Sequence, residues 1–108
     1  MRPSLALRMY SAQLTLFTRA NCGLCDVAKA RVAEVLKKRT VDYKEVDIMA
    51  EGQNEWKNMY DFDVPVLHVE RVQHTYSKPN IVMEAKKLMH RFSEEDVEKL
   101  IEDAEQGQ

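Results

Sequence analysis

The chain has 108 residues, of which 44% are hydrophobic and 31% are charged, and its formal net charge is −2. This length supports one hydrophobic core, and the composition excludes a disordered chain and a nucleic-acid-binding protein, which would carry a basic surface. No apolar run is long enough to span a membrane, and two cysteines are too few for the disulfide framework of a small secreted protein. We therefore expect one globular domain that binds neither nucleic acid nor membrane.

The first twelve residues differ in composition from the rest of the chain. They contain two arginines, and the first acidic residue of the chain is Asp26. An arginine-containing, acid-free start is typical of mitochondrial presequences, and "RMYSA" fits the Arg-x-Tyr-Ser pattern at which matrix presequences are cleaved. The alternative is a polar lead-in to the first strand. We predict a lead or targeting segment at 1–12, a domain at 13–105 and a tail at 106–108, with the mitochondrial matrix as location and the cytoplasm as the alternative.

A strand, a helix and a second strand are predicted next. The stretch "QLTLFT" at 13–18 is short, apolar and β-prone, as a buried strand is. Asn21 is the predicted N-cap of a helix, because apolar residues recur at helical spacing from there to Leu36. The basic run 37–39 is predicted to be the solvated end of this helix. Residues 40–48 predict a strand parallel to the first, with a right-handed crossover between the two.

A short helix and a third strand follow. Residues 51–60 ("EGQNEWKNMY") predict the helix. Large side chains in and before it are expected to pack against the sheet; these are Met49, Trp56, Met59 and Tyr60. Residues 64–70 predict the third strand, with Pro65 marking its start, because proline is confined to strand starts and edges.

The segment before the last helix carries weaker signals. Residues 71–80 ("RVQHTYSKPN") predict a loop. Residues 86–92 predict a fourth strand with Leu88, His90 and Phe92 on one face, whereas the stretch "VMEAK" receives no assignment.

The last helix has clear start signals. Ser93 is the predicted N-cap, and Asp96 stands at the third helical position, so the two residues can form a capping box. Phe92 and Val97 occupy the positions of a hydrophobic staple. The predicted buried stripe of the helix consists of Val97, Leu100, Ile101 and Ala104.

Both cysteines of the chain, Cys22 and Cys25, lie where the first helix begins, in a CxxC motif. A helix N-terminus exposes unpaired N–H groups and partial positive charge, and both lower the pKa of a cysteine thiol. Cys22 is nearer the helix end and is the predicted nucleophile. Cys25, one turn inward, can attack a mixed disulfide on Cys22 and close an intramolecular disulfide.

This order of elements, with "CGLC" after the first strand and "DVPVLHV" at the third, resembles the thioredoxin superfamily and its glutaredoxin branch in particular. The resemblance covers about 13–104. It implies a thioredoxin-like α/β fold with a four-stranded mixed sheet flanked by helices on both faces. It also implies thiol–disulfide exchange through Cys22 and Cys25.

The resemblance also implies roles for residues around the cysteines. The Val64–Pro65 bond should be cis, and the backbone of Val64 should pair with the substrate; the alternative is an ordinary trans proline that opens a strand. Arg19 matches a lysine that contacts a glutathione carboxylate and supports the thiolate in many glutaredoxins. The alternative for Arg19 is a solvated loop cation.

The sequence departs from ordinary glutaredoxins around the cysteines and the third strand. Gly23 and Leu24 replace the Pro and Tyr of the usual CPYC motif, and Asp63 replaces a Thr. The pattern is most similar to divergent glutaredoxin-like proteins, some of them mitochondrial, that carry CGLC or CPLC and an "RF" before the last helix.

Before the last helix, the Gly-Gly pair that helps to form the γ-glutamyl pocket is absent. Arg91 and Phe92 stand there instead, and Ser93 begins the helix where the family binds the glutathione α-carboxylate. Glu94 and Glu95 would repel that carboxylate, although Arg91 could offer it a guanidinium fork. We therefore predict weak glutathione binding.

Two other functions compete with disulfide exchange. Cys22 and Cys25 could form part of a zinc or iron–sulfur site with His68, His74 or His90, although the sequence has no second CxxC and no HxxxH spacing. The domain could also be a non-enzymatic binding module, since fold alone does not assign function. We predict a monomeric thiol–disulfide oxidoreductase that acts on protein disulfides, without a bound cofactor and with glutathione as a candidate reductant.

Overall fold

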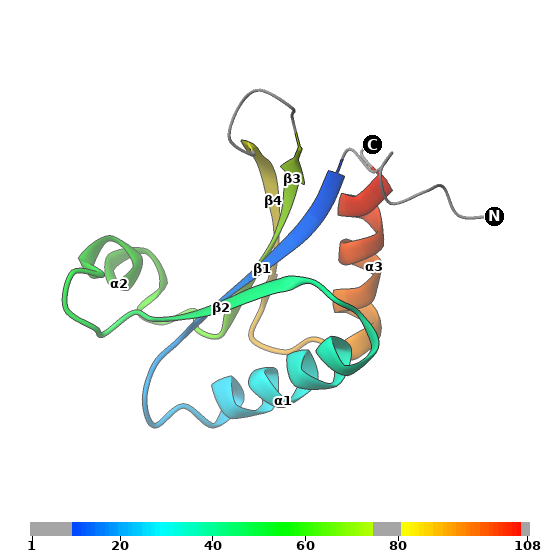
Figure 1. The fold of residues 1–108 in the computed structure, drawn as a ribbon. Coiled ribbons are helices and arrows are strands. Elements are labelled where there is room, and N and C mark those ends of the chain that lie inside the picture. The colour runs from blue at the N-terminus through cyan, green and yellow to red at the C-terminus, as the bar shows by residue number, and fades with distance from the viewer. Residues whose placement is uncertain (1–9, 75–80, 107–108) are drawn as a thin grey trace.

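The structure is a computed structural model that describes residues 10–74 and 81–106. Its elements are β1 (Tyr10–Thr18), α1 (Gly23–Lys38), β2 (Asp42–Asp47), α2 (Asn54–Tyr60), β3 (Val66–Gln73), β4 (Ile81–Met89) and α3 (Glu94–Gln106) (Figure 1). Within the described part, no helix has the length and apolar character needed to cross a bilayer.

The four strands form one mixed sheet in the order β2-β1-β3-β4. β2 lies parallel to β1, as predicted for a strand–helix–strand unit, while β3 is antiparallel to both β1 and β4. Phe17 is level with both Val46 and Val66, and Val66 is level with Met89. The last residues of β1, β2 and β4 and the first residues of β3 therefore share one end of the sheet. We call it the cysteine end, because the chain passes from it into the CxxC motif.

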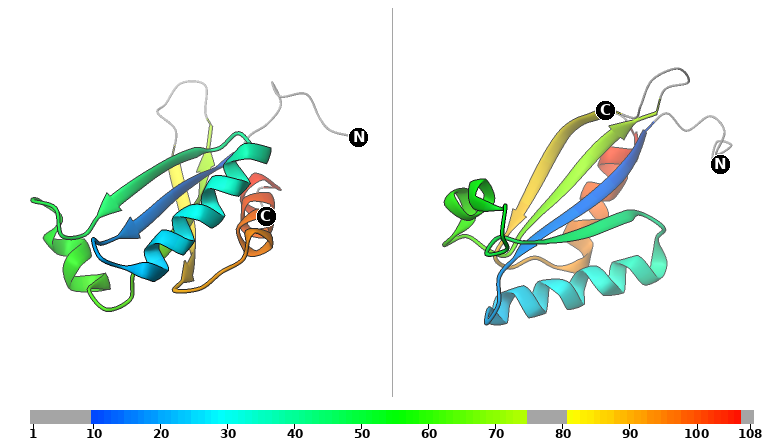
Figure 2. Two further views of the ribbon diagram at one scale, coloured as in Figure 1. Left: turned by 90° about the horizontal axis from the view of Figure 1, so that it is seen from below. Right: turned by 60° about the vertical axis from the view of Figure 1, so that its left-hand side comes forward.

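Helices flank the sheet, so the predicted thioredoxin-like α/β architecture is confirmed (Figure 2). α1 and α3 pack together on one face, and α2 lies against the other face near the cysteine end. Between α1, α3 and the sheet lies the larger core cluster, which includes Leu14, Leu16, Val32, Val35, Leu67, Val97 and Ile101. Under α2, the smaller cluster contains Phe17, Ile48, Tyr60 and Val66, with Trp56 packed against it.

Of the four large side chains predicted to pack against the sheet in and before α2, two do so and two do not. Tyr60 is buried, and the Trp56 ring lies 4.4 Å from the Phe17 ring between centroids, so these side chains pack against the sheet as expected. Met49 and Met59 are exposed, and the prediction that they pack against the sheet is wrong. A seven-residue helix has only two turns, so it brings few side chains to the sheet.

The pairing of β1 with β3 extends both strands beyond their predicted ends. β1 begins at Tyr10, which is level with Gln73. Residues 71–73, predicted as loop, are therefore strand, because their backbone groups pair with the start of β1. The rest of the predicted loop, except His74, lies at 75–80, outside the described residues.

The fourth strand was predicted too late in the chain. β4 spans Ile81–Met89 and so contains the stretch "VMEAK", and of the three residues expected on one face only Leu88 lies in the strand. His90 has φ 63° and turns the chain out of the strand, while its N–H donates to the carbonyl of Pro65 at 2.8 Å. Phe92 lies just before α3, and it is buried in the larger core cluster with Val97 of that helix.

The predicted start of α3 is confirmed. Ser93 Oγ accepts a hydrogen bond from the Asp96 N–H at 3.1 Å, and Asp96 Oδ2 accepts one from the Ser93 N–H at 3.0 Å. The Ser93 N–H, and to a smaller extent the Ser93 hydroxyl, hold the pKa of the Asp96 carboxyl below its usual value. Phe92 and Val97 are both buried, as a hydrophobic staple requires.

The basic end of α1 is solvated, as predicted, because Lys37 and Lys38 are exposed, but it also contacts α3. Lys38 lies 3.3 Å from the Glu94 carboxylate, and Arg39 pairs with Glu98 at 3.5 Å and with Glu102. Because α1 and α3 lie side by side, charges that are 56 or more residues apart in sequence come together.

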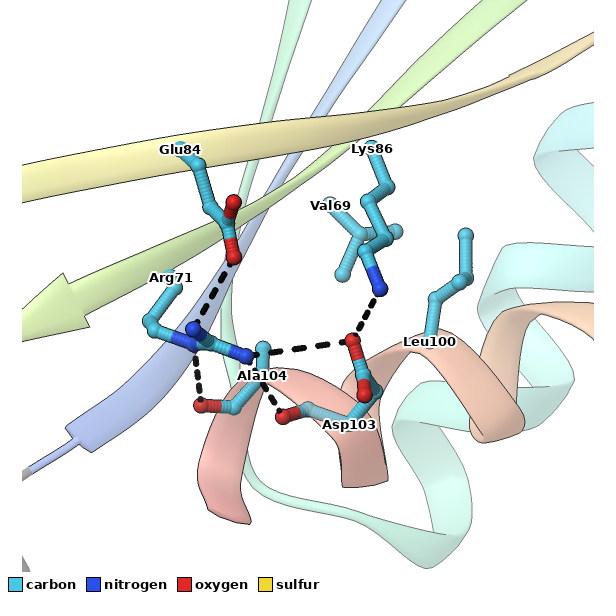
Figure 3. Close-up of a pocket in the computed structure, with 7 residues that line it drawn as sticks. All are labelled: Val69, Arg71, Glu84, Lys86, Leu100, Asp103 and Ala104. Atoms are coloured by element: carbon cyan, nitrogen blue, oxygen red, sulfur yellow. Dashed lines mark hydrogen bonds and ion pairs between the residues drawn. The ribbon is translucent and has the colours of Figure 1, made fainter. Parts of the chain in front are cut away.

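Arg71 is a buried cation that the sequence analysis placed in a loop. Only 6% of the residue is exposed. Its guanidinium donates to the carbonyls of Ala104 and Asp103 at 3.3 and 3.1 Å and lies 2.9 Å from the Glu84 carboxylate (Figure 3). α3 has no basic residue in its last turn, so Arg71 of β3 supplies both donors and positive charge to that helix end.

Candidate active site

Cys22 and Cys25 form a disulfide at the cysteine end of the sheet. Their Cα atoms are 5.2 Å apart, within the usual range for a disulfide. Cys22 is partly exposed, whereas only 1% of Cys25 is accessible to solvent. An incoming disulfide can therefore reach the first sulfur more readily than the second. This agrees with Cys22 as the attacking residue and Cys25 as the resolving residue.

Cys22 is also the N-cap of α1, and the prediction that Asn21 takes this position is wrong. Cys22 has an extended backbone (φ −120°, ψ 105°), which an N-cap needs, whereas Asn21 has φ 59°. Cys22 Sγ accepts a hydrogen bond from the Cys25 N–H at 3.1 Å. In the reduced protein, the same N–H and the helix N-terminus favour a thiolate on Cys22.

The loop that precedes β3 carries the predicted cis peptide bond. Val64–Pro65 is cis, as the resemblance implied, and Pro65 is buried while Val64 is partly exposed. The alternative of a trans proline is therefore wrong. The pairing of the Val64 backbone with a substrate remains a prediction.

Arg19 contacts this loop. Its Nη1 donates to the Asp61 carboxylate at 2.9 Å and to the Asp61 carbonyl at 3.0 Å. The Arg19 side chain is 35% exposed, and its pairing with Asp61 joins the loop after β1 to the loop before β3. The contact of Arg19 with a glutathione carboxylate and with the thiolate stays a prediction. Asp61 was not predicted from the sequence, because no local pattern links residues 42 positions apart.

The residues predicted to surround a glutathione carboxylate lie in the segment after β4 and in the first turn of α3. Arg91 is exposed. Ser93 is exposed too, but its N–H and hydroxyl are both bonded to Asp96. Glu94 lies 3.3 Å from Lys38, so part of its negative charge is compensated. A ligand carboxylate at this helix start would have to compete with Asp96.

The histidines proposed as metal ligands have other partners. His68 Nε2 lies 2.8 Å from the Tyr60 hydroxyl, and His74 Nε2 lies 2.8 Å from the Ser11 hydroxyl. His90 Nε2 is 3.8 Å from the Asp63 carboxylate. Within residues 10–74 and 81–106, no group of three His, Cys, Asp or Glu side chains is arranged to hold a metal ion. The alternative of a metal site therefore gains no ligand set from these residues.

A sequence model of the glutaredoxin-like domain (DUF836) matches residues 13–102, which is most of the chain. The chain belongs to the glutaredoxin-like domain family. Membership of this family, with a CxxC pair at disulfide distance, supports a thiol redox role for this glutaredoxin-like protein.

Solved structures with the same fold include proteins of several kinds. The solution structure of protein Ne2328 from Nitrosomonas europaea is 24% identical, with a TM-score of 0.58 over 92% of this chain and 95% of that one. Thioredoxin O2 from Arabidopsis thaliana in the oxidized state is 21% identical, with a TM-score of 0.56 over 88% and 76%. Chloroplastic thioredoxin z is 15% identical, with a TM-score of 0.60 over 90% and 80%. At these identities the likeness establishes the thioredoxin fold.

Proposed function

We propose that this glutaredoxin-like protein is a monomeric thiol–disulfide oxidoreductase that acts on protein disulfides. The observation that carries the proposal is the asymmetry of the cysteine pair. Cys22 is partly exposed and caps α1, and Cys25 is buried beside it. A binding module has no chemical need for either sulfur, whereas disulfide exchange needs one accessible sulfur and one that attacks from within.

The exchange requires no bound cofactor. The Cys22 thiolate attacks one sulfur of the substrate disulfide, so a mixed disulfide forms and the other substrate sulfur leaves as a thiolate. The Cys25 thiolate then attacks Cys22 Sγ, which closes the intramolecular disulfide and releases the second substrate thiolate. Two electrons pass from the protein dithiol to the substrate, and an external thiol, for which glutathione is our candidate, restores the dithiol by the reverse exchange.

A trapping experiment tests this assignment of roles. Cys25→Ser should stall after the first step and accumulate a mixed disulfide between Cys22 and its substrates, which mass spectrometry can identify. Cys22→Ser is the matched control and should trap nothing. Equal trapping by both variants, or no turnover of any disulfide by the wild type, would contradict the proposal. Binding without turnover would favour a non-enzymatic module.

We propose that glutathione binds weakly to this protein. Arg91 and Phe92 stand where the Gly-Gly pair of ordinary glutaredoxins allows close backbone approach, and the polar groups of Ser93 are bonded to Asp96. The test compares turnover of a small glutathionylated disulfide with turnover of a protein disulfide, with glutathione as reductant and a CPYC glutaredoxin run alongside. Activity on the small substrate equal to that of the CPYC protein would contradict the proposal.

We also propose that the protein acts in the mitochondrial matrix. The acid-free, arginine-containing start and the "RMYSA" pattern support this location. The pattern overlaps the start of β1, where Tyr10 is level with Gln73, so cleavage there would leave nearly all of β1 in place. N-terminal sequencing of the protein from isolated mitochondria should find an end within this pattern. A protein that retains Met1 and occurs only in the cytosolic fraction would contradict the proposal.

A further inference from the structure

Phe62 is an aromatic side chain that the fold leaves in solvent. It lies between α2 and β3, and 91% of the residue is exposed, the largest value among the exposed large hydrophobic residues that the structure describes. Apolar atoms at the surface are common, but a whole phenylalanine ring in water forgoes the stabilisation that burial would bring. Neither core cluster of the described residues includes it.

The backbone around Phe62 is fixed on both sides. On one side, Asp61 is held by Arg19 through both its carboxylate and its carbonyl. On the other side, the Asp63 N–H donates to the Tyr60 carbonyl at 2.9 Å, and the Pro65 carbonyl accepts from the His90 N–H at 2.8 Å. The ring is therefore presented by an anchored loop, and binding through it costs little ordering of the chain.

Phe62 belongs to the cysteine end of the sheet. Its loop runs into Pro65 and β3 there, and Arg19, three residues before Cys22, anchors it. Three exposed methionines lie near the same end: Met49 after β2, Met59 in α2 and Met89 at the end of β4. Methionine side chains adapt to different partners, whereas a phenylalanine on a fixed loop gives one defined contact.

We propose that Phe62 is a specificity-determining residue for disulfide exchange and selects protein disulfides whose cysteine is flanked by an apolar side chain. This inference rests on the proposed function and names its substrate class. While Cys22 attacks the substrate sulfur, the ring of Phe62 covers the apolar neighbour of the substrate cysteine. The gain comes from removing two apolar surfaces from water, so a polar neighbour or a small disulfide does not benefit.

The test uses Phe62→Ala with three substrates: two disulfide peptides that differ only in leucine or serine beside the cysteine, and hydroxyethyl disulfide. For wild type, kcat/KM should be higher on the leucine peptide than on the serine peptide. Phe62→Ala should lower kcat/KM on the leucine peptide about tenfold, as loss of a binding hot spot does, and leave the other two nearly unchanged. Phe62→Leu should retain part of the preference.

Met83→Ala is the matched control, because Met83 is also exposed but lies in β4 toward the opposite end of the sheet. It should leave all three rates unchanged. Equal losses on all three substrates in Phe62→Ala would assign Phe62 a role in the fold and overturn the inference, as would no loss on any. If wild type turns over no protein disulfide either, the proposed function itself fails; if it turns over a protein disulfide but does not prefer the leucine peptide, the inference about Phe62 alone fails. Thermal unfolding of Phe62→Ala should match wild type, since the ring contributes to neither core cluster.

Discussion

Arg19 has a partner, Asp61, that was not predicted from the sequence. The resemblance assigned its charge to a thiolate and a glutathione carboxylate, but its guanidinium contacts the carboxylate and carbonyl of Asp61. A cation already paired with a carboxylate exerts less net attraction on a nearby thiolate. We therefore expect two separable effects of Arg19, one on the charge near Cys22 and one on the position of the loop before β3.

Variants of this pair separate the two effects. We expect Arg19→Ala to raise the pH midpoint of Cys22 alkylation, because a positive charge near the thiolate is lost. Asp61→Asn should lower that midpoint, because the charge of Arg19 is no longer compensated. The measurement is the rate of alkylation of the reduced protein against pH. A midpoint that moves in the same direction in both variants, or in neither, would leave Arg19 with only its effect on the loop.

The burial of His68 predicts that the free energy of unfolding depends on pH. It is 8% exposed, and its ring lies 2.8 Å from the Tyr60 hydroxyl. Burial, and to a smaller extent the charge of Lys87, lower the pKa of His68 below its ordinary value of 6.5. The unfolded chain therefore takes up a proton at a higher pH than the folded protein does, so the free energy of unfolding should fall as the pH decreases from about 6.5 toward the lowered pKa.

The experiment measures urea unfolding between pH 7.5 and about 5. We expect His68→Gln to be less stable than wild type at neutral pH and to lose less stability on acidification. His74→Gln, which removes a histidine just beyond β3, is the matched control and should retain the wild-type pH dependence. Parallel pH profiles for wild type and His68→Gln would contradict the assignment.

Among the helices and strands, α3 has a start that neighbouring residues alone predict. Ser93 and Asp96 are three residues apart, and their reciprocal hydrogen bonds follow from that spacing alone. β4, in contrast, has no local pattern that predicts it. Residues 81–87 are all exposed, and the register with β3 shifts between Arg71 and Val72, so the strand has no alternation of buried and exposed residues to reveal it.

The capping box predicts the effect of one substitution. Ser93→Ala should lower the free energy of unfolding by about 1 kcal/mol, because the N–H of Asp96 loses its acceptor. Ser93→Asn retains a capping oxygen and should lie closer to wild type. Urea unfolding of the three proteins measures the difference. If Ser93→Ala and Ser93→Asn are equally stable, the cap contributes nothing measurable.

At the scale of the whole molecule, Arg71 joins the sheet to the C-terminal end of α3. It donates to two carbonyls at that end and lies beside Glu84 of β4 (Figure 3). The last four carbonyls of a helix have no partner within the helix, so a buried guanidinium there stabilises both the helix end and its packing on the sheet.

We expect Arg71→Ala to lower the free energy of unfolding by about 2–3 kcal/mol, the usual scale for losing a hydrogen bond to a charged group. Arg71→Lys keeps the charge but loses the planar fork, so it should be intermediate. Urea unfolding gives the free energies, and hydrogen exchange should show faster exchange at the end of α3 in Arg71→Ala. Wild-type exchange there would contradict the role assigned to Arg71.

Features that depend on residues close together in the chain can be predicted from the amino-acid sequence alone. The CxxC pair at a helix start, the proline that opens β3 and the capping box of α3 all rest on local spacing, and the structure retains each of them. Periodic apolar residues likewise indicated α1 and the parallel pairing of β1 with β2. The resemblance to glutaredoxins added the cis configuration of the Val64–Pro65 bond.

Pairings between residues far apart in the chain are set by tertiary packing instead. Arg19 meets Asp61 across 42 positions, and Arg71 meets Ala104 across 33. The full length of β3 became visible only through its pairing with β1, and β4 only through its pairing with β3. A charged side chain, or the backbone groups of an edge strand, pair with residues that only folding brings close. The spacing of residues along the chain does not predict those partners.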